Sequence, residues 1–306
     1  MTIYQYSITY PDHLTPMSVD KLMRKLLIPR KWRHFLRSEK KILINGKYLP
    51  LNFLVKPGDK IEIQLDHIES DQQPYPASGK LPKVVYEDND ILVINKPAGQ
   101  KTHPNLNEED TALNDCATYL GYSPFIVHRL DMLTSGLLLV AKNPAVVPIL
   151  NRQLTDKTLH REYLAWISNS PQIKNTGIID LPIGHDPHDQ RKRMVRQDGQ
   201  KAVTHYEVIK RDKDRILVKL TLETGRTHQI RVHLAALGAP IIGDPLYNSA
   251  YQDGEQLQLT AFQLTFQKHL SFENKSVKLE KKYKRYDKTY LFYLCLKQES
   301  NLHSLA

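Results

Sequence analysis

The sequence of 306 residues predicts an α+β protein with a mixed, largely antiparallel central sheet and flanking helices. Two observations predict this class. From residue 84 onward, strand-like segments follow one another with few helices between them, whereas a doubly wound fold alternates strands with helices. Before them, two short basic helical segments and a few strands predict a separate small α/β domain. A chain of this length can form two such cores.

The composition excludes several classes of protein. Hydrophobic residues make up 41% and charged residues 25%, as in soluble globular proteins. No segment approaches the roughly 20 apolar residues of a membrane span, and the first residues lack the basic start and apolar core of a secretory signal. Cys116 and Cys295 are the only cysteines. We therefore expect a cytoplasmic protein without a disulfide framework or a cysteine-rich zinc site.

Positive charge is concentrated near the start of the chain. The formal net charge is +10. Residues 21–41 hold nine lysines and arginines and one acid, Glu39. Lys21, Arg24 and Arg33 belong to this patch. Dispersed charge would indicate only solubility, whereas a patch of this density indicates a polyanionic partner.

Residues 1–68 are predicted to form the first domain. Ser18 can cap a helix in which residues 19–27 carry apolar side chains at helical spacing. Pro29 ends it, and a second basic helix follows. KILINGKYL then reads as two short strands about an Asn-Gly turn, and KIEIQL alternates as a strand. Residues 69–83 carry three prolines without apolar periodicity and are predicted to be a linker.

Residues 84–272 are predicted to form the second domain. VVYEDNDILVINKPAG reads as strand, turn, strand and loop, and GLLLVA at 136–141 as a buried strand. NPAVVPILNRQL reads as a helix with Pro148 in its first turn. HREYLAWI, THYEVIK and RILVKLTLE alternate as strands, and RTHQIRVHLAALG reads as a helix capped by Thr227 and ended by Gly238. Residues 273–306 are predicted to be a basic tail, either a peripheral helix or loosely attached.

The loop at 128–136, HRLDMLTSG, leads directly into the buried strand. A carboxylate held at the lip of a rigid strand is well placed for chemistry, which makes Asp131 the first candidate. The alternative is that Asp131 pairs with Arg129 or caps a turn, as polar loop residues often do.

Two further residues are candidates. Arg231 lies one turn into the predicted helix without a local acid, so it either has a partner from elsewhere in the fold or lies in solvent. Tyr163 shares a strand face with Arg161 and Ala165. Its ring can be core packing or a platform on which a base stacks.

Motifs for metals and nucleotide cofactors are missing from the sequence. His228 and His233 are five residues apart and do not share a helix face, and no cysteine joins them. There is no P-loop, GxGxxG or GxSxG pattern. A glycosidase needs two carboxylates around the bond. Asp131 has no acidic neighbour in its own motif, although Glu162, Glu223 or Asp244 could approach it in the fold.

Four segments resemble, in order, the signature blocks of the RluA/RluD-type pseudouridine synthases: INKPAGQKTHP, HRLDMLTSG, REYLA and TGRTHQIRVHLAALGAPIIGDPLY. The resemblance covers about residues 84–266. Residues 17–66 are similar to the small alpha-L (S4-like) RNA-binding module that often precedes this catalytic domain. That similarity rests on the basic helix pair and on the segments ILING and KPGDKIEI.

The resemblance implies that selected uridines in RNA are isomerised to pseudouridine. It implies that Asp131 is the essential aspartate, Arg231 the arginine that pairs with it, Tyr163 the active-site tyrosine, and Arg129 the residue that fills the space left by the flipped nucleotide. It favours large-subunit ribosomal RNA, with transfer RNA as the alternative. The reaction is redox-neutral, so no cofactor and no metal are expected, and a monomer is the default. Further predicted RNA contacts are His128, Arg161, Arg226, Arg191, Arg193, Lys21, Arg24 and Arg33.

Several points stay open at this stage. Asp131 could attack the sugar or the base, or remove a ribose proton. Arg161 stands where the family usually has lysine, and Thr260 where histidine is commoner. The basic loop at 184–202 either folds over RNA or is solvated surface. The competing hypotheses are a non-catalytic RNA-binding or assembly factor, and a nuclease or glycosidase.

Overall fold

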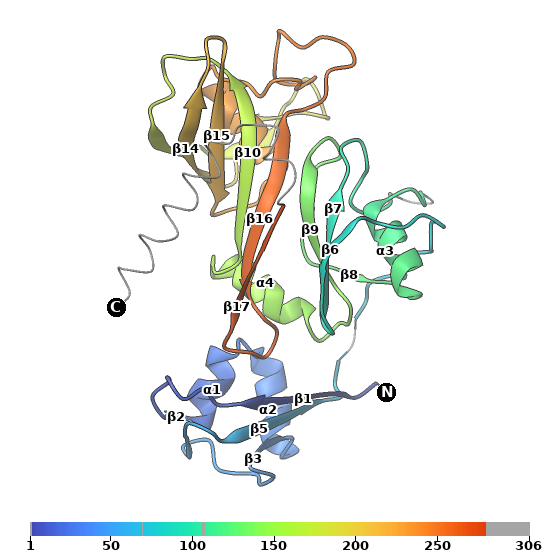
Figure 1. The fold of residues 1–306 in the computed structure, drawn as a ribbon, viewed down its shortest axis with the longest axis vertical. Helices are drawn as coiled ribbons and strands as arrows, with labels where there is room; N and C mark the ends of the chain where they lie inside the picture. Colours follow the sequence, from blue (N-terminus) through green and yellow to red (C-terminus); the bar gives the residue numbers. More distant parts are fainter. Residues whose placement is uncertain (1, 69, 106–107, 280–306) are drawn as a thin grey trace.

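The computed structural model describes residues 2–68, 70–105 and 108–279 (Figure 1). In these residues a small N-terminal module packs against one end of a larger domain built on a long twisted sheet. The part of the predicted tail at 280–306 lies outside the described residues.

The N-terminal module contains both predicted helices and a small antiparallel sheet in the order β1-β5-β3. Asn45 and Gly46 both have positive φ, 52° and 76°, as the predicted Asn-Gly turn requires. The first strand was not predicted from the sequence. The elements are β1 (Tyr4–Thr9), β2 (Met17–Ser18), α1 (Val19–Lys25), α2 (Arg30–Ser38), β3 (Ile42–Ile44), β4 (Leu54–Val55) and β5 (Lys60–Leu65).

The core of the module is shared with the larger domain. Apolar side chains of α1 and α2, such as Leu22 and Leu36, pack with those of β5. The same cluster includes Ala145, Ile149 and Leu270 from the larger domain. A module this small benefits from such additional buried apolar area.

The predicted linker has no helix or strand in its described residues, yet it is bonded along its length to the larger domain. Gln72 donates to the Pro124 carbonyl at 2.7 Å and accepts from the Ile126 amide at 2.9 Å. Ser78 donates to Asp115 Oδ1 at 2.6 Å. The segment is therefore attached to the larger domain by specific hydrogen bonds.

The larger domain has a ten-stranded mixed sheet, in the order β11-β14-β15-β10-β16-β9-β7-β6 with β17 on β16 and β8 on β9. Among the strands of the described residues, only β9 and β16 pair in parallel, so the predicted α+β class with a largely antiparallel sheet is confirmed. The strands are β6 (Val84–Glu87), β7 (Ile91–Lys96), β8 (Phe125–Ile126), β9 (Ser135–Ala141), β10 (His160–Ser168), β11 (Thr176–Asp180), β14 (Val203–Arg211), β15 (Arg215–Leu222), β16 (Leu259–Gln267) and β17 (Asn274–Lys278).

The central strands of the sheet are buried on both faces, and their side chains alternate between two apolar clusters. On β10, Tyr163 and Ala165 belong to one cluster, and Leu164 and Trp166 to the other. The first cluster includes residues of α3 (Ala112–Leu120) and α5 (Gln229–Ala236), and the second includes residues of α4 (Val147–Thr155). Pro148 lies in the first turn of α4, as predicted.

Three local predictions were wrong. The N-cap of α5 is His228 in the left-handed region (φ 58°), not Thr227, because the Gln229 side chain accepts from the Arg226 amide and the Thr224 hydroxyl instead. The start of the predicted tail forms β17, which pairs with β16. The predicted basic loop contains a two-stranded hairpin, β12 (Ile183–His185) with β13 (Arg193–Val195).

Candidate active site

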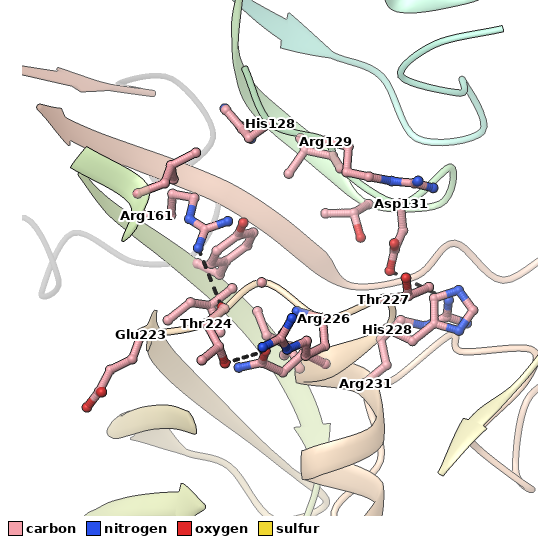
Figure 2. Close-up of a pocket in the computed structure, with 18 of the residues that line it drawn as sticks. His128, Arg129, Asp131, Arg161, Glu223, Thr224, Arg226, Thr227, His228 and Arg231 are labelled. Carbon is pink, nitrogen blue, oxygen red and sulfur yellow. Dashed lines mark hydrogen bonds and ion pairs between the residues drawn. The ribbon is translucent and has the colours of Figure 1, made fainter. Parts of the chain in front are cut away.

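A cavity of about 530 Å³ opens where the loop before β9, the start of β10 and the segment before α5 meet (Figure 2). Seven of the residues predicted from the sequence line it: His128, Arg129, Asp131, Arg161, Tyr163, Arg226 and Arg231. The structure therefore assembles blocks that lie about 30 to 100 residues apart in the sequence into one site.

Asp131 lies in a loop whose main chain is bonded on both sides. Thr102 Oγ1 donates to the Leu130 carbonyl at 2.7 Å and accepts from its amide at 3.1 Å. The Met132 carbonyl accepts from the Gly99 amide at 2.9 Å. The Thr134 amide bonds the Asp131 main-chain oxygen, so the turn does not use the carboxylate, which stays 21% exposed. The result is a fixed backbone with an accessible carboxylate.

Lys96 does not line this cavity, but it supports the Asp131 loop from behind, and sequence reasoning missed it. It is fully buried at the end of β7, and its ammonium donates to the carbonyls of Pro97, Gln100 and Met132 at 2.9, 2.6 and 3.1 Å. Burial lowers the pKa of Lys96 to about 8, against the opposing effect of the Asp131 charge. Lys96 thus bonds the residue next to Asp131. The signal was a lysine at the end of an apolar strand, ILVINK.

Gly136 allows β9 to start at this place. Its φ is 115°, and a Cβ there would lie 2.1 Å from the carbonyl oxygen of Ala261 on β16. Only glycine tolerates both the conformation and the close approach. This contact sets the distance between the Asp131 loop and the centre of the sheet.

Arg231 is buried and has two carboxylate neighbours. Its Nε and Nη2 donate to the two oxygens of Asp244 at 2.8 and 2.7 Å, and its Nη1 is 4.0 Å from Asp131 Oδ2. Burial lowers the pKa of Arg231, but the hydrogen bonds and charge of Asp244 outweigh it and the pKa is raised. The strong partner is therefore Asp244, and Asp131 lies at the outer limit of an ion pair.

The alternative that Arg231 lies in solvent is wrong. All side chains from Gln229 to Leu234 are buried, so α5 has no solvated face in this stretch. Sequence reasoning raised Asp244 only as a possible second carboxylate and did not assign it to Arg231. The GDPLY block that follows the helix carries it.

Tyr247, in that block, connects three parts of the site. Its hydroxyl accepts from the Arg193 amide at 2.8 Å and bonds His228 Nδ1 at 2.8 Å. Its ring lies under the Arg231 guanidinium, with 5.0 Å from Cζ to the ring centroid. Tyr247 thus holds the β12–β13 hairpin, the left-handed His228 and Arg231 in one arrangement.

Tyr163 lies at an irregularity of β10. The pairing of β10 with β16 shifts register between Glu162 and Tyr163, which re-aims a side chain next to the cavity. Its side chain is 5% exposed, and burial raises the pKa of its hydroxyl above the ordinary value. Tyr163 packs in the core cluster, as the first alternative predicted, and it also lines the cavity. Its role as a stacking platform stays a prediction.

His128 is buried and neutral. Its Nε2 accepts from the Leu139 amide at 3.1 Å, which places the proton of the neutral ring on Nδ1. Burial, with the nearby charge of Arg161, lowers the pKa of His128 to about 3. Its main contact is with β9, so the structure shows a residue that supports the cavity wall.

Arg161 and Arg129 differ in how they are held. Arg161 donates to the Thr224 carbonyl at 3.4 Å, and a Cβ on Gly225 would lie 2.9 Å from its Nη1, so the glycine makes room for the guanidinium. Arg129 forms no hydrogen bond or ion pair with any residue in the part of the chain that the structure describes. The pairing of Asp131 with Arg129 is therefore not observed.

A second cavity, of about 490 Å³, lies beside the first and shares Gly225, Arg226 and Thr227 with it. Arg193 lines it and donates to the carbonyls of Gln190 and Lys192. Arg191 lines neither of these two cavities. It is 76% exposed and pairs with Asp189.

The predicted basic residues of the module lie on α1 and α2, outside the cavity. Lys21 is exposed, Arg24 pairs with Asp20 at 2.8 Å, and Arg33 is 3.7 Å from the same carboxylate. Asp20 lies just before the basic segment 21–41 and compensates part of the positive charge of that segment.

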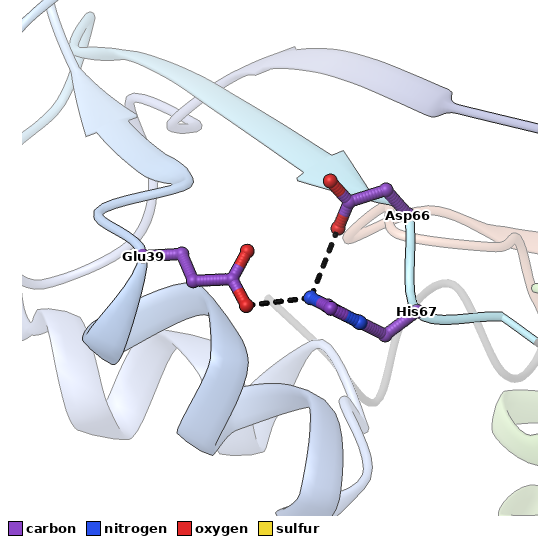
Figure 3. A group of neighbouring side chains, drawn as sticks. All are labelled: Glu39, Asp66 and His67. Atoms are coloured by element: carbon purple, nitrogen blue, oxygen red, sulfur yellow. Dashed lines mark hydrogen bonds and ion pairs between the residues drawn. The ribbon is translucent and has the colours of Figure 1, made fainter. Parts of the chain in front are cut away.

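One set of possible metal ligands comes together among the described residues: Glu39, Asp66 and His67 (Figure 3). His67 Nε2 is 2.5 Å from Glu39 and 3.6 Å from Asp66. The Lys41 ammonium contacts both carboxylates, and these hydrogen bonds, that to Asp66 first, raise its pKa. Since Lys41 already supplies the positive charge, the set is an ion-pair network that joins the end of α2 to the end of β5.

No helix among the described residues has the length and apolar character needed to cross a membrane.

Comparisons with known proteins identify the family of the chain. The family described as RNA pseudouridylate synthase matches residues 90–236, and the RluD ribosomal pseudouridine synthase N-terminal domain matches residues 6–61. The uncharacterized RNA pseudouridine synthase YhcT of Bacillus subtilis is 43% identical over 221 residues, which cover 69% of this chain and 71% of that protein.

Two further proteins extend the comparison. The ribosomal large subunit pseudouridine synthase D of Nitrosomonas europaea is 36% identical over 255 residues, which cover 80% of this chain and 73% of that protein. The solved structure of human RNA pseudouridylate synthase domain containing 1 superposes with a TM-score of 0.58 at 26% identity and covers 68% of this chain and 86% of that one. The fold, the blocks around the cavity and these similarities lead to one conclusion: the chain belongs to the RluA/RluD-type RNA pseudouridine synthases, enzymes that isomerise uridine in RNA.

Proposed function

We propose that this enzyme converts uridine to pseudouridine in large-subunit ribosomal RNA, with Asp131 as its essential carboxylate. The observation that carries the proposal is the position of Asp131, whose partly exposed carboxylate lies in an open cavity 4.0 Å from the buried Arg231 guanidinium. The choice of RNA is supported by relatives named ribosomal large subunit pseudouridine synthase D.

The reaction requires the uracil to leave the RNA stack, because the base cannot be detached and turned over within it. A cavity of about 530 Å³ has room for a nucleotide. Tyr163 offers a ring against which uracil stacks. Arg129, which is held by no ion pair among the described residues, is free to enter the space the base leaves, since guanidinium planes stack well on bases.

Asp131 then acts as nucleophile or as proton acceptor. Arg231 faces it with one nitrogen while Asp244 fixes the other two, so the positive charge is oriented before substrate arrives. The reaction moves one bond from nitrogen to carbon within the same nucleotide and changes no oxidation state, so the proposed mechanism uses no cofactor and no metal.

The N-terminal module is proposed to add RNA affinity through Lys21, Arg24 and Arg33. We propose residues 1–68 as this RNA-binding domain and residues 69–83 as its connection. The catalytic domain is then proposed to begin at 84 and to extend through β17. The enzyme is proposed to work as a monomer in the cytoplasm.

The proposal is tested by incubating the purified protein with an unmodified transcript of large-subunit ribosomal RNA and mapping pseudouridines. The expected result is one or a few discrete new sites. Modification of a transfer RNA transcript in its place would contradict the choice of substrate. RNA cleavage or free uracil would support a nuclease or glycosidase, and binding without modification would support a non-catalytic RNA-binding factor.

A further inference from the structure

Helix α4 contacts both the N-terminal module and the active-site cavity. Ile149 in its first half is buried in the core of the module, whereas Leu154 and Thr155 at its end line the cavity. The six-residue step from Ile149 to Thr155 spans about 9 Å along the helix. The module therefore begins about three stacked nucleotides away from the cavity.

Arginine and lysine side chains follow this path. Arg152 lies one turn after Ile149 on the same side of α4 and is 44% exposed. Arg24 and Arg33 lie on the module at one end, and Lys157 and Arg161 line the cavity at the other. We call the set Arg24, Arg33, Arg152, Lys157 and Arg161 the cationic track. Asp20, Asp156 and Glu223 pair with some of these cations, so the track keeps a positive excess.

Arg33 shows that like charges are held together where the two domains meet. Its side chain is 14% exposed, and its Nε is buried without a hydrogen-bond partner among the described residues. Burial lowers its pKa, and so do the charges of Arg24 on the module and Arg152 on α4, against the opposing effect of Asp20. Repulsion of this kind costs stability in the free protein and is relieved by a bound polyanion.

The position of the module relative to α4 is fixed by polar contacts beside the shared core. Tyr6 of β1 donates to Asp90 at 3.4 Å, and Asn143, just before α4, donates to the same carboxylate at 3.1 Å. The Tyr6 ring also meets His269 edge-on at 4.7 Å between centroids. The module and α4 are therefore held against each other in one arrangement (Figure 1).

We propose that the RNA strand that places its uridine in the cavity continues along the cationic track, so that Arg152 of the catalytic domain and Arg33 of the module bind phosphates of the same strand. The inference rests on the proposed function, because the strand is defined by the uridine that enters the cavity. It assigns an RNA contact to Arg152 and makes α4 the bridge between the two domains.

The test measures how RNA affinity depends on salt. The variants are Arg152→Gln, Arg33→Gln and their combination, studied in the full chain with a fluorescent RNA hairpin of about 20 nucleotides between about 50 and 200 mM salt. The matched control is Arg215→Gln, which also removes an exposed arginine that pairs with a nearby aspartate, Asp212 in place of Asp156. Arg215 is the register partner of Ser168 in the pairing of β15 with β10. Ser168 lies at the opposite end of β10 from Arg161, so the control is far from the track.

Each track variant should weaken RNA binding. It should also make the plot of log affinity against log salt concentration less steep, by just under one unit for each single variant and by nearly two for the combination. The control should leave the slope unchanged. An Arg152→Gln slope equal to that of the control overturns the proposal, and since Arg152 is exposed, a loss of folding does not complicate this variant. The measurement reports binding alone. A wild-type protein that forms no pseudouridine would refute the proposed function and leave these slopes as they are.

Discussion

Arg231 and Asp244 form a bidentate ion pair inside the protein, with 2% and 0% of their side chains exposed. This geometry leaves Nη1 of the guanidinium to face Asp131. The distance from Nη1 to the Asp131 carboxylate is 4.0 Å. One carboxylate thus orients the arginine, and the other is available to substrate. The distinction explains why two acids next to one arginine need not have the same role.

Replacing Asp244 by asparagine tests this division. Asp244→Asn leaves the buried Arg231 charge without its ionic partner, and breaking a buried pair in this way costs about 3–5 kcal/mol. We expect the free energy of unfolding, from urea titration, to fall by about 3 kcal/mol and turnover to fall with it. Unchanged stability and turnover would show that Asp131 alone holds Arg231.

Lys96 gives a prediction about pH. Its pKa is about 8 in the folded protein, below the ordinary value of 10.5, so between these values the unfolded chain holds the proton more firmly. Below pH 8, burying the charged lysine lowers the free energy of unfolding by its full amount. This loss of stability becomes smaller as the pH rises toward 10.5, because the buried amine is then neutral. From pH 7 to pH 10, the wild type should therefore gain about 2 kcal/mol relative to Lys96→Met. A stability difference that is constant with pH would refute the shifted pKa.

Gly136 and Gly99 form a matched pair for testing the close approach of β9 to β16. Both have positive φ, but a Cβ on Gly136 meets the Ala261 backbone, whereas one on Gly99 meets nothing within 4 Å. Gly99→Ala should cost about 1 kcal/mol from backbone strain alone. Gly136→Ala should cost at least about 2 kcal/mol more, because neither backbone can yield easily. Equal losses in thermal or urea unfolding would mean that the contact is not tight.

Two substitutions of Tyr163 separate the contribution of its ring from that of its hydroxyl. Tyr163→Phe keeps the ring, so RNA affinity should stay close to that of the wild type. Tyr163→Leu removes the ring and should cost about 1–3 kcal/mol of binding, the usual worth of a base–aromatic stack. Both variants keep an apolar side chain in the core cluster. If Tyr163→Leu bound RNA as tightly as Tyr163→Phe, the ring would have no role in holding the base.

The sequence predicted most elements of the fold because periodicity and turn chemistry are local. The strand 136–141, the helix with Pro148 in its first turn and the two helices of the module are examples. The misses depend on distant parts of the chain. The strand β1 is stabilised by pairing with β5, about 55 residues away, and β17 by pairing with β16. The left-handed His228 at the start of α5 follows from the bonds of the neighbouring Gln229 side chain.

The site was predicted to a similar extent. Asp131, Tyr163 and Arg231 stand in long recognisable blocks, and the structure brings them to one cavity. The residues that hold them were not found, because Lys96 bonds a carbonyl 36 residues away and Asp244 pairs across 13 residues. Their residue types carried the signal, a lysine in an apolar strand and an acid after a helix, but the partner is specified only by the fold.

The central claim is that the Asp131 carboxylate drives the isomerisation, and the most direct measurement is release of the hydrogen on uracil carbon 5 by Asp131→Asn. The amide keeps the size of the side chain and the main-chain bonds of its loop, so the variant should fold and bind RNA as the wild type does. We predict no detectable release from an RNA that the wild type modifies. Release at a substantial fraction of the wild-type rate, from a correctly folded variant, would contradict the account.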